Sequence, residues 1–406
     1  MDALMLPLNW QRVRLGDIAE IKRGASPRPI ENPKWFCANS NVGWVRISDI
    51  SKNSRFLYKT AQKLSKKGIE KSRLVKQNSL IMSMCATIGK PIITKIDTCI
   101  HDGFVVFENP KIDLNYLYYF LCYIEKEWLE SGQQGSQVNL NVDLIKNKEV
   151  FYPKDLNEQI AIANVLSDVD HYLYSLDALI LKKEGVKKAL RIKMLNQILA
   201  SNGVEFRELG DIILSLKTGL NPRSFFKLNT PNANNYYVTI RELEDYTIKF
   251  THQTDRIDDN ALSLCLKRSN LEKDDILFSG TGTIGKVSII EKNPNNWAIK
   301  EGIYSIKPNK KIVFPRFLMF CLESSNIQND IKNKSFGGIV KSIPMNDLKQ
   351  IQIPLPPLNE QIAIANILSA LDSEIISLKN KKRQFENIKK ALNHDLMSAK
   401  IRVLKK

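Results

Sequence analysis

The sequence predicts an α+β protein of pseudo-two-fold design, in which two mixed α/β domains are joined by two long helices that pair as an antiparallel coiled coil. The first observation behind this prediction is a long internal repeat: residues 156–167 return as residues 358–369 with one change, from Val165 to Ile367. The second is the spacing of apolar residues after each copy, and the third is the order of charges along both segments. A repeat of such long period sets the architecture of the whole chain.

Weaker repetition extends into the regions that precede the two helices. Leu-Gly-Asp-Ile stands at residues 15–18 and again at 209–212, and Thr-Ile-Gly-Lys stands at 87–90 and again at 283–286. Between these anchors the two copies diverge. The sequence therefore predicts a variable domain at residues 1–153, a repeated helix at 154–203, a second variable domain at 204–353 and a second repeated helix at 354–406.

Each variable domain is predicted to mix strands and helices. Short runs rich in Val, Ile, Phe and Tyr, such as residues 80–82, 104–107 and 287–290, are bounded by Gly, Pro and Asn and predict strands. Residues 115–128 and 315–322 predict one helix in each domain. We expect the tyrosines of the first of these helices to pack in the core rather than to form a base-stacking face.

Both repeated segments carry apolar residues at alternating spacings of four and three, which is the pattern of a coiled-coil seam. Neither helix contains an internal proline, and a helix from Asn157 to about Ser201 would be roughly 65 Å long. The predicted seam residues are Ile162, Leu166, Val169, Leu173, Leu176 and Ile180 in the first copy, and Ile364, Leu368, Leu371, Ile375 and Leu378 in the second.

The order of charges favours an antiparallel pairing of these helices. Acidic residues lie early and basic residues late in each segment, as Asp170 and Lys187 do in the first copy and Asp372 and Lys389 in the second. An antiparallel pair sets acidic ends beside basic ends, whereas a parallel pair places like charges together. The same order also suits each helix dipole, so it supports the antiparallel arrangement without requiring it.

The composition indicates a folded protein that attracts polyanions. Hydrophobic residues make up 43% and charged residues 25%, as in globular proteins. No apolar run approaches the roughly 20 residues of a membrane span, and the first residues lack a secretion signal, so we expect a cytoplasmic protein without membrane contact. The net charge of +17 favours nucleic acid as the partner, although a general lysine bias of the source proteome would produce the same excess.

The sequence predicts no catalytic residue, metal or cofactor. The six cysteines are scattered and only four histidines are present, which does not suit a zinc site. Residues 280–286 fit two glycine-rich nucleotide patterns, but strand-like residues follow where such sites need a helix. We interpret this loop and its counterpart at 84–90 as tight hairpins that carry a lysine. The motifs of amino-methyltransferases, zinc peptidases and serine hydrolases are missing.

The run Pro354-Leu355-Pro356-Pro357-Leu358-Asn359-Glu360-Gln361, followed by a long helix, resembles the specificity subunits of type I restriction-modification enzymes. The first copy departs slightly, with Tyr152-Pro153-Lys154-Asp155 before Leu156. The resemblance covers nearly the whole chain, because the motif occurs twice at domain spacing and each domain opens with Leu-Gly-Asp.

This resemblance implies a DNA-reading subunit without chemistry of its own. Each variable domain would be a target recognition domain that reads half of a split, non-palindromic site in double-stranded DNA, and the helices would set the gap. Two such readers on one face of the duplex should sit about 34–36 Å apart. The helices would dock two methylation subunits that bring S-adenosylmethionine, and two restriction subunits that translocate DNA with ATP could join them.

Candidate contact residues follow from repeated positions and from glycine-flanked polar loops, where side chains can reach base edges or phosphates. For the DNA these are Arg28, Lys90, Gln133, Gln134, Ser136, Gln137, Arg223, Lys286, Lys341 and Ser342. Candidates for the partner surface are residues near the helix starts that are identical in both copies: Glu158, Gln159, Asn164, Glu360, Gln361 and Asn366. Solvated loops and helix capping are the alternatives for the two sets.

Two other functions fit parts of the pattern. A stand-alone DNA-binding regulator built as a fused dimer would need a recognition helix, and no convincing helix-turn-helix is seen. A coiled-coil scaffold that binds proteins alone would have its charge from lineage bias.

Overall fold

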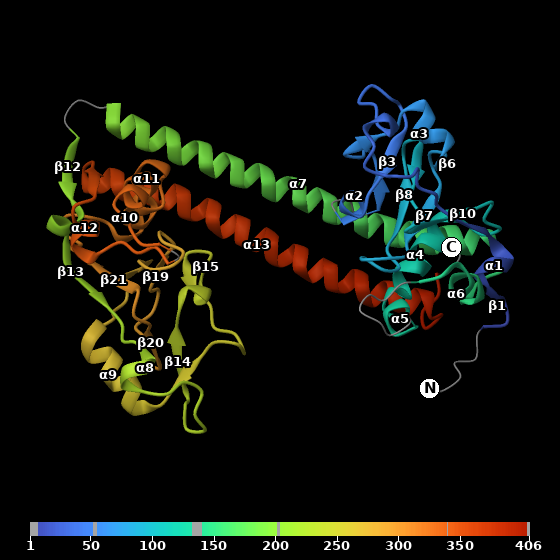
Figure 1. Ribbon diagram of the computed structural model, residues 1–406. Helices are drawn as coiled ribbons and strands as arrows, with labels where there is room; N and C mark the ends of the chain where they lie inside the picture. The colour runs from blue at the N-terminus through green and yellow to red at the C-terminus, as the bar shows by residue number, and fades with distance from the viewer. Residues whose placement is uncertain (1–6, 52–54, 132–139, 201–203, 339, 404–406) are drawn as a thin grey trace. The chain divides into compact units, whose positions relative to one another are not determined.

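The computed structural model describes residues 7–51, 55–131, 140–200, 204–338 and 340–403. The chain forms two compact units: residues 1–176 with 382–406, and residues 177–381. Each unit holds one variable domain together with parts of both long helices, α7 (Leu156–Ala200) and α13 (Leu358–Met397) (Figure 1). Both helices are divided between the two units, and the four consecutive segments predicted from the sequence stay a prediction.

In the first unit, β1 (Trp10–Arg14) pairs antiparallel with β11 (Glu149–Pro153), so the domain opens and closes on neighbouring strands. Its main sheet has the order β2-β10-β7-β8-β4. The strands are β2 (Glu20–Arg23), β10 (Phe104–Glu108), β7 (Leu80–Ser83), β8 (Pro91–Thr94) and β4 (Phe56–Leu57). A second sheet has the order β5-β3-β9-β6, formed by β5 (Gln62–Lys63), β3 (Gly43–Val45), β9 (Thr98–Ile100) and β6 (Arg73–Val75).

Short helices surround these sheets. They are α1 (Leu15–Ile18), α2 (Ile47–Ser51), α3 (Lys66–Glu70), α4 (Leu114–Tyr123), α5 (Glu125–Ser131) and α6 (Val142–Asn147). Asp113 caps α4 by accepting a hydrogen bond from the Tyr116 amide at 2.8 Å. Tyr116, Tyr119 and Phe120 are fully buried, which confirms that the aromatic residues of this segment form core. Side chains of α4 and of the start of α7 belong to one hydrophobic cluster.

The second unit repeats the plan. β12 (Glu205–Glu208) pairs with β22 (Gln352–Leu355), and the main sheet has the order β13-β21-β18-β19. Those strands are β13 (Ile213–Thr218), β21 (Ile303–Pro308), β18 (Ile276–Ser279) and β19 (Val287–Ile289). The second sheet, β17-β14-β20, consists of β17 (Arg256–Ile257), β14 (Asn235–Val238) and β20 (Trp297–Ile299), and a two-stranded ribbon consists of β15 (Leu243–Glu244) and β16 (Thr247–Ile248).

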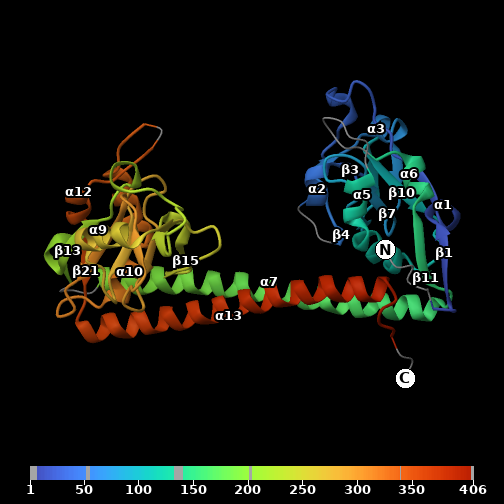
Figure 2. The ribbon, with the colours of Figure 1, turned by 90° about the horizontal axis from the view of Figure 1, so that it is seen from below.

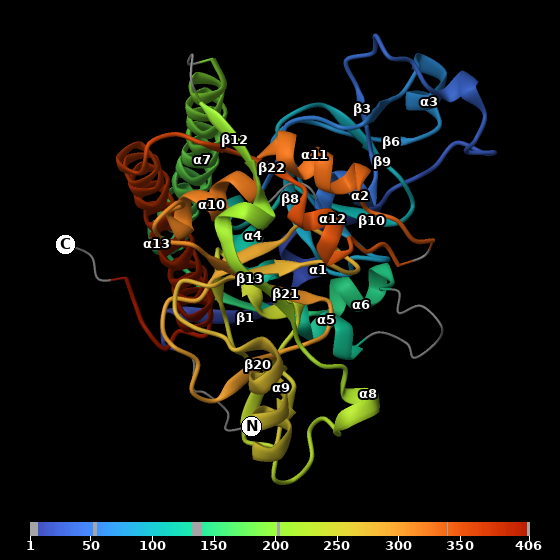
Figure 3. The ribbon, with the colours of Figure 1, turned by 90° about the vertical axis from the view of Figure 1, so that its left-hand side faces the viewer.

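The helices of this domain are α8 (Pro222–Phe225), α9 (Asp259–Ser269), α10 (Pro315–Leu322), α11 (Ser325–Asn333) and α12 (Met345–Lys349). Helix α9 lies beside β20 (Figure 3). Every residue of α10 except Arg316 is buried, and the helix packs against β19 as α4 packs against β8 in the first unit.

The two long helices run antiparallel within each unit. In the first unit Asp170 of α7 pairs with Lys389 of α13, and the later Tyr172 contacts the earlier Phe385. In the second unit Lys183 pairs with Glu374 and Lys187 with Asp372, again in opposite chain order. Of the predicted seam, Ile162, Leu166, Leu176, Ile180, Leu368 and Ile375 are buried. The pattern of the sequence thus gave the correct helix pairing.

Helix α13 is, among the described helices, the one long and apolar enough by length and composition to cross a membrane. Only 22% of its most apolar 18-residue window is buried, and the core helix of a soluble protein also passes this test. Several apolar side chains at the start of this helix are exposed.

Candidate nucleic-acid interface and helix surface

In the first unit, three chain segments meet at one end of the main sheet because β2, β10 and β7 are neighbours. The Gly24 amide donates to the Phe104 carbonyl and the Met84 amide donates to the Gly103 carbonyl, both at 2.8 Å. A Cβ on Gly24 would lie 2.1 Å from the His101 oxygen, so only glycine allows this approach. We call this region, which comprises residues 23–28, 84–90 and 101–103, the loop end of the first unit.

Asp102 joins these segments through its side chain and its carbonyl. Its Oδ1 accepts a hydrogen bond from the Ser26 hydroxyl at 2.8 Å, and its Oδ2 pairs with the Arg28 guanidinium at 2.9 Å. The Arg23 Nε donates to the Asp102 carbonyl at 2.7 Å. Partial burial alone would raise the pKa of Asp102, but the Ser26 hydroxyl and the Arg28 charge outweigh it and hold that pKa below its usual value. The carboxylate is therefore ionised and fixed in place.

Two more arginines lie around this group. The Arg73 Nε donates to the Arg23 carbonyl at 2.5 Å, and Arg46 is exposed and close enough to His101 to help lower the pKa of that imidazole, whose burial is the larger cause. Four arginines from three segments thus lie at this loop end, two of them in direct contact with Asp102. Such a surface suits a phosphate backbone, and arginine is also the commonest reader of guanine.

The second unit has an equivalent loop end, made of residues 218–223, 280–286, 300–302 and 336–342. A Cβ on Gly219 would lie 1.8 Å from the Ile299 oxygen, the same close approach that Gly24 makes. The Gly280 amide donates to the Gly302 carbonyl and the Gly282 amide to the Lys341 carbonyl, both at 2.8 Å. In this domain Phe336 and Ser342 pair antiparallel, and Ser342 also pairs with Thr281 of the glycine-rich loop; Figure 2 shows the second unit from below.

The glycine-rich loop 280–286 is a strand-to-strand hairpin, since β18 and β19 are antiparallel neighbours. The Ser279 hydroxyl accepts from the Lys286 amide and donates to the Thr283 carbonyl, and Ser83 makes the same bonds with Lys90 and Thr87. These bonds give both hairpins the same backbone, and the positive φ angles of Gly89 (74°) and Gly285 (92°) explain why both copies have glycine there. A nucleotide-binding helix does not follow the loop, in agreement with the interpretation from sequence.

The predicted DNA contacts fall into three groups. Arg28, Lys341 and Ser342 lie at the loop ends, where Arg28 and Lys341 are exposed and Ser342 is half-buried. Lys90 and Lys286 follow the hairpin tips; Lys90 is half-buried, and the Lys286 ammonium donates to the Ile240 carbonyl at 3.2 Å. Gln133, Gln134, Ser136 and Gln137 lie outside the described residues, as does the side chain of Arg223, whose backbone belongs to α8.

Sequence reasoning missed Asp102, Arg23 and Arg73. A signal was present: Lys22-Arg23-Gly24-Ala25-Ser26-Pro27-Arg28 corresponds to Lys217-Thr218-Gly219-Leu220-Asn221-Pro222-Arg223. The shared glycine marks the close backbone approach. Nothing in the sequence indicates that Asp102, 74 residues from Arg28, completes the cluster.

A second set of polar contacts joins each domain to the long helices. In the first unit Asp170, which is 7% exposed, accepts from the Tyr119 hydroxyl at 2.7 Å and pairs with Lys389 at 2.5 Å. The Arg55 guanidinium donates to the Tyr119 hydroxyl at 2.9 Å and to the Ser167 hydroxyl at 2.7 Å. One buried network therefore holds α4, α7 and α13 together.

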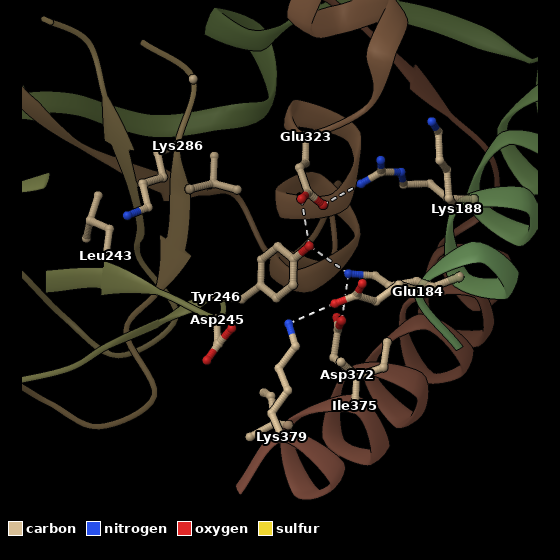
Figure 4. A pocket seen from close by; sticks show the side chains of 15 residues that line it. Glu184, Lys188, Leu243, Asp245, Tyr246, Lys286, Glu323, Asp372, Ile375 and Lys379 are labelled. Atoms are coloured by element: carbon tan, nitrogen blue, oxygen red, sulfur yellow. Dashed lines mark hydrogen bonds and ion pairs between the residues drawn. The ribbon is translucent and has the colours of Figure 1, made fainter. Parts of the chain in front are cut away.

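In the second unit the corresponding ion pair is formed by Lys187 and Asp372, 2.6 Å apart (Figure 4). The Lys187 ammonium also donates to the Tyr246 hydroxyl at 2.6 Å, and that hydroxyl donates to Glu323 at 2.6 Å. Arg191 pairs with the same glutamate. These groups and Lys286 line a pocket of about 400 Å³.

The repeated aspartate and lysine therefore form two reciprocal ion pairs between the long helices. The aspartate of the first copy meets the lysine of the second, and the lysine of the first copy meets the aspartate of the second. The domains complete the network differently, with Tyr119 from α4 in one unit and Tyr246 from the β15–β16 turn in the other. Identical residues on the helices accordingly receive non-identical domains.

Gln159 and Gln361 are buried and hydrogen-bonded within their own units, so they are not part of an exposed partner surface. Gln159 accepts from the Asp113 amide at 2.8 Å and donates to the Pro153 carbonyl at 2.9 Å. Gln361 accepts from the Phe314 amide at 2.8 Å and donates to the Pro356 carbonyl at 2.9 Å. Both are at most 2% exposed, so they tie each helix start to its own domain and offer no surface.

Of the other predicted partner residues, Glu158 is also buried. It pairs with Arg402 at 3.2 Å and accepts from the Asn9 amide group at 2.8 Å, which brings both ends of the described chain to one carboxylate in the first unit. Asn164, Glu360 and Asn366 are exposed. Glu158 and Glu360 therefore have different surroundings although their sequence contexts match.

Apolar side chains surround the exposed members of this set. Leu156 is 53% and Ile160 38% exposed on α7, and Leu358 is 38% and Ile362 37% exposed on α13. Residues four apart lie on one helix face, so Leu156, Ile160 and Asn164 form one stripe, with Leu358, Ile362 and Asn366 as its copy. We call these the twin helix faces. Exposed apolar stripes of this kind mark interaction surfaces.

Two domains with basic loop ends, each followed by a long helix whose sequence occurs twice in the chain, define a DNA-recognition protein. The chain belongs to the family described as type I restriction modification DNA specificity domains. A sequence model of that family matches residues 7–183 and again residues 201–387, so each match takes in one domain and much of the helix that follows it. No cluster of His, Cys, Asp and Glu suited to a metal occurs among the described residues.

Two relatives are similar to this chain over nearly its whole length. The chain is 27% identical to the putative type I restriction enzyme MjaX specificity subunit of Methanocaldococcus jannaschii, over 98% of this chain and 95% of that protein. It is 24% identical to the MjaVIII specificity subunit of the same organism, over 99% of this chain and 95% of the relative.

Solved structures show the same fold. The S subunit of a type I restriction-modification system from M. genitalium matches with a TM-score of 0.61 and 16% identity over 97% of both chains. A chain from a structural study of assembly and conformational transition in a type I system matches with a TM-score of 0.57 and 15% identity, over 97% of this chain and 98% of that one. The regulator and scaffold alternatives gain no support from these likenesses.

Proposed function

We propose that the loop ends of the two units read the two halves of a split, non-palindromic site in double-stranded DNA, within a type I restriction-modification complex. The observation that carries this proposal is that the two loop ends share one backbone framework but differ in side chains. Arg23, His101 and Asp102 of the first unit correspond to Thr218, Lys300 and Glu301 of the second. A common frame with different side chains suits two readers of different half-sites.

The twin helix faces are the proposed docking sites for two methylation subunits. Because Leu156, Ile160 and Asn164 recur as Leu358, Ile362 and Asn366, one kind of partner can bind twice in the same way. Because the two faces are identical at these positions, the proposal is that each copy of this chain binds two methylation subunits. Two restriction subunits joining the methylating complex extend the proposal, and the mass of the purified complex tests their presence and number.

A genome-wide map of methylated adenine, taken with this gene intact and deleted, tests the reading function. We expect one split, non-palindromic motif to disappear on deletion while every other methylated motif remains. Retention of all motifs in a cell that produces the methylation subunits would contradict the proposal.

The docking sites are tested by charge substitutions on the twin helix faces. Ile160→Glu and Ile362→Glu should each remove one methylation subunit from the purified complex, and the double variant should remove both, as read by native mass spectrometry. Ile388→Glu is the matched control, because Ile388 is 49% exposed on α13 but lies well away from the helix start. Loss of both subunits from either single variant would argue against two independent sites.

A further inference from the structure

We propose that Arg28 reads a guanine in the half-site recognised by the first unit, and that Asp102 is the positioning residue that orients its guanidinium. The inference rests on the proposed function and adds the base and the residue that selects it. A guanine in the major groove presents two acceptors, N7 and O6, to which one arginine can donate two parallel hydrogen bonds. Adenine presents a donor in place of O6, so the same contact rejects it.

The geometry around Arg28 suits a reader better than a phosphate contact. Its side chain is 73% exposed, yet its NH2 group is held by Asp102 at 2.9 Å. One of the five donors of the guanidinium is used in this bond, and the remaining donors stay available to a base. A fixed, planar fork loses less conformational freedom on binding a base edge than a free side chain would.

Asp102 is itself fixed from several directions. Its Oδ1 accepts from Ser26, two residues before Arg28, and its carbonyl accepts from Arg23. The backbone beneath is locked by the close approach of Gly24 to His101. The carboxylate is therefore a rigid support, whose position does not depend on the DNA.

The other arginines of the cluster differ in this respect. Arg23 and Arg73 are held through Nε by main-chain carbonyls, at 2.7 and 2.5 Å, and neither forms an ion pair with a carboxylate of the described residues. We assign them to the phosphate backbone, which needs charge more than direction. In the second unit the position of Asp102 is taken by Glu301, one methylene longer, so the inference is confined to the first unit.

The test uses the complete complex of this chain with its methylation subunits, and the variants Arg28→Ala, Arg28→Lys and Asp102→Asn. The matched control is Lys76→Ala: the cation of the Lys76–Asp97 pair matches that of the Arg28–Asp102 pair in exposure, 73%, but the pair flanks β6 and β9 at the end away from Arg73 and lies outside the loop end. The readouts are the methylated motif in cells and the methylation rate on duplexes that carry 7-deazaguanine, which lacks N7, at each guanine in turn.

We expect Arg28→Ala to relax one guanine position in one half-site, lowering discrimination against adenine there by roughly 5- to 150-fold. Arg28→Lys should relax the same position although it keeps the charge, and Asp102→Asn should do so in part, with the other half-site still strictly read. Substitution by 7-deazaguanine at that position should slow the wild type and leave Arg28→Ala unaffected. Lys76→Ala should match the wild type.

Two results would overturn the inference. A uniform loss of methylation on all sequences, restored by Arg28→Lys, would make Arg28 a phosphate contact. An unchanged motif in Arg28→Ala would remove it from recognition. Failure of the proposed function is distinct from both, because the wild-type complex would then show no split motif.

Discussion

The buried ion pair between Lys187 and Asp372 gives the sharpest prediction about stability. The ammonium and the carboxylate are 2.6 Å apart, and the two side chains are 10% and 14% exposed. The ammonium also lies 4.1 Å from the centre of the Tyr246 ring. Lys187→Met keeps most of the volume and removes the charge, so it leaves Asp372 buried without its counter-ion.

Breaking a buried pair by removing one partner costs about 3–5 kcal/mol. The carboxyl group can escape by taking up a proton, which for a pKa of 3.8 costs at most about 4 kcal/mol at pH 7. Burial already raises the pKa of Asp372, although Lys187 opposes that rise, so the escape is cheaper than this limit. We expect a loss of about 3 kcal/mol at pH 7 that falls to a few tenths of a kcal/mol at pH 5, because each of the two pH units lowers the cost of protonation by about 1.4 kcal/mol.

The assay is urea unfolding of the full chain labelled with 5-fluorotryptophan, followed by fluorine NMR. Trp297 is the one tryptophan in residues 177–381, so its resonance reports on the second unit. Lys183→Met is the control, because the Lys183–Glu374 pair is 29% and 46% exposed and should contribute about 0–1 kcal/mol. Equal losses for Lys187→Met and Lys183→Met, or no recovery on adding Asp372→Asn to Lys187→Met, would refute the reasoning.

Three further predictions concern single residues. Gln361→Leu leaves the Phe314 amide and the Pro356 carbonyl without their partner and should cost about 2–4 kcal/mol, whereas Asn359→Leu at an exposed neighbouring position should cost little; urea unfolding compares them. Burial raises the pKa of Asp275 to about 6, so its protonated form favours the folded state at low pH and that contribution is lost as the pH rises from about 4 through 6. Asp275→Asn should therefore gain up to about 3 kcal/mol over the wild type between pH 4 and pH 7, and parallel stability curves would contradict this. Gly185→Ala has open space around the new methyl group inside α7 and should raise stability by up to about 1 kcal/mol, seen as a higher melting temperature.

The helical frame could be predicted from the sequence because its determinants are local and written twice. The seam spacing of four and three predicted α7 and α13, and the order of Asp170 and Lys187 predicted their antiparallel pairing. The repeat alone does not show whether a given repeated residue serves folding or partner binding. Gln159 and Asn164 are both identical in the two copies, yet Gln159 is buried and hydrogen-bonded whereas Asn164 is exposed.

The loop ends were less accessible to sequence reasoning because their groups come together only through the sheet. Arg28 and Asp102 meet since β2 pairs with β10, and a register of this kind is not written in the residues around either side chain. The Tyr246 contact is hidden for the same reason, because the first unit makes the equivalent contact from α4. Both cases depend on long-range pairing that no local pattern reports.

The loop ends are held together by main-chain hydrogen bonds, such as those of Gly24 with Phe104 and of Gly280 with Gly302. Because these bonds do not involve the side chains at the tips, mutations there can accumulate with little loss of folding free energy. A lineage could therefore pass from one target sequence to another through a few viable substitutions, without an unfolded intermediate. The divergence of the two domains within this one chain is what such a history would leave behind.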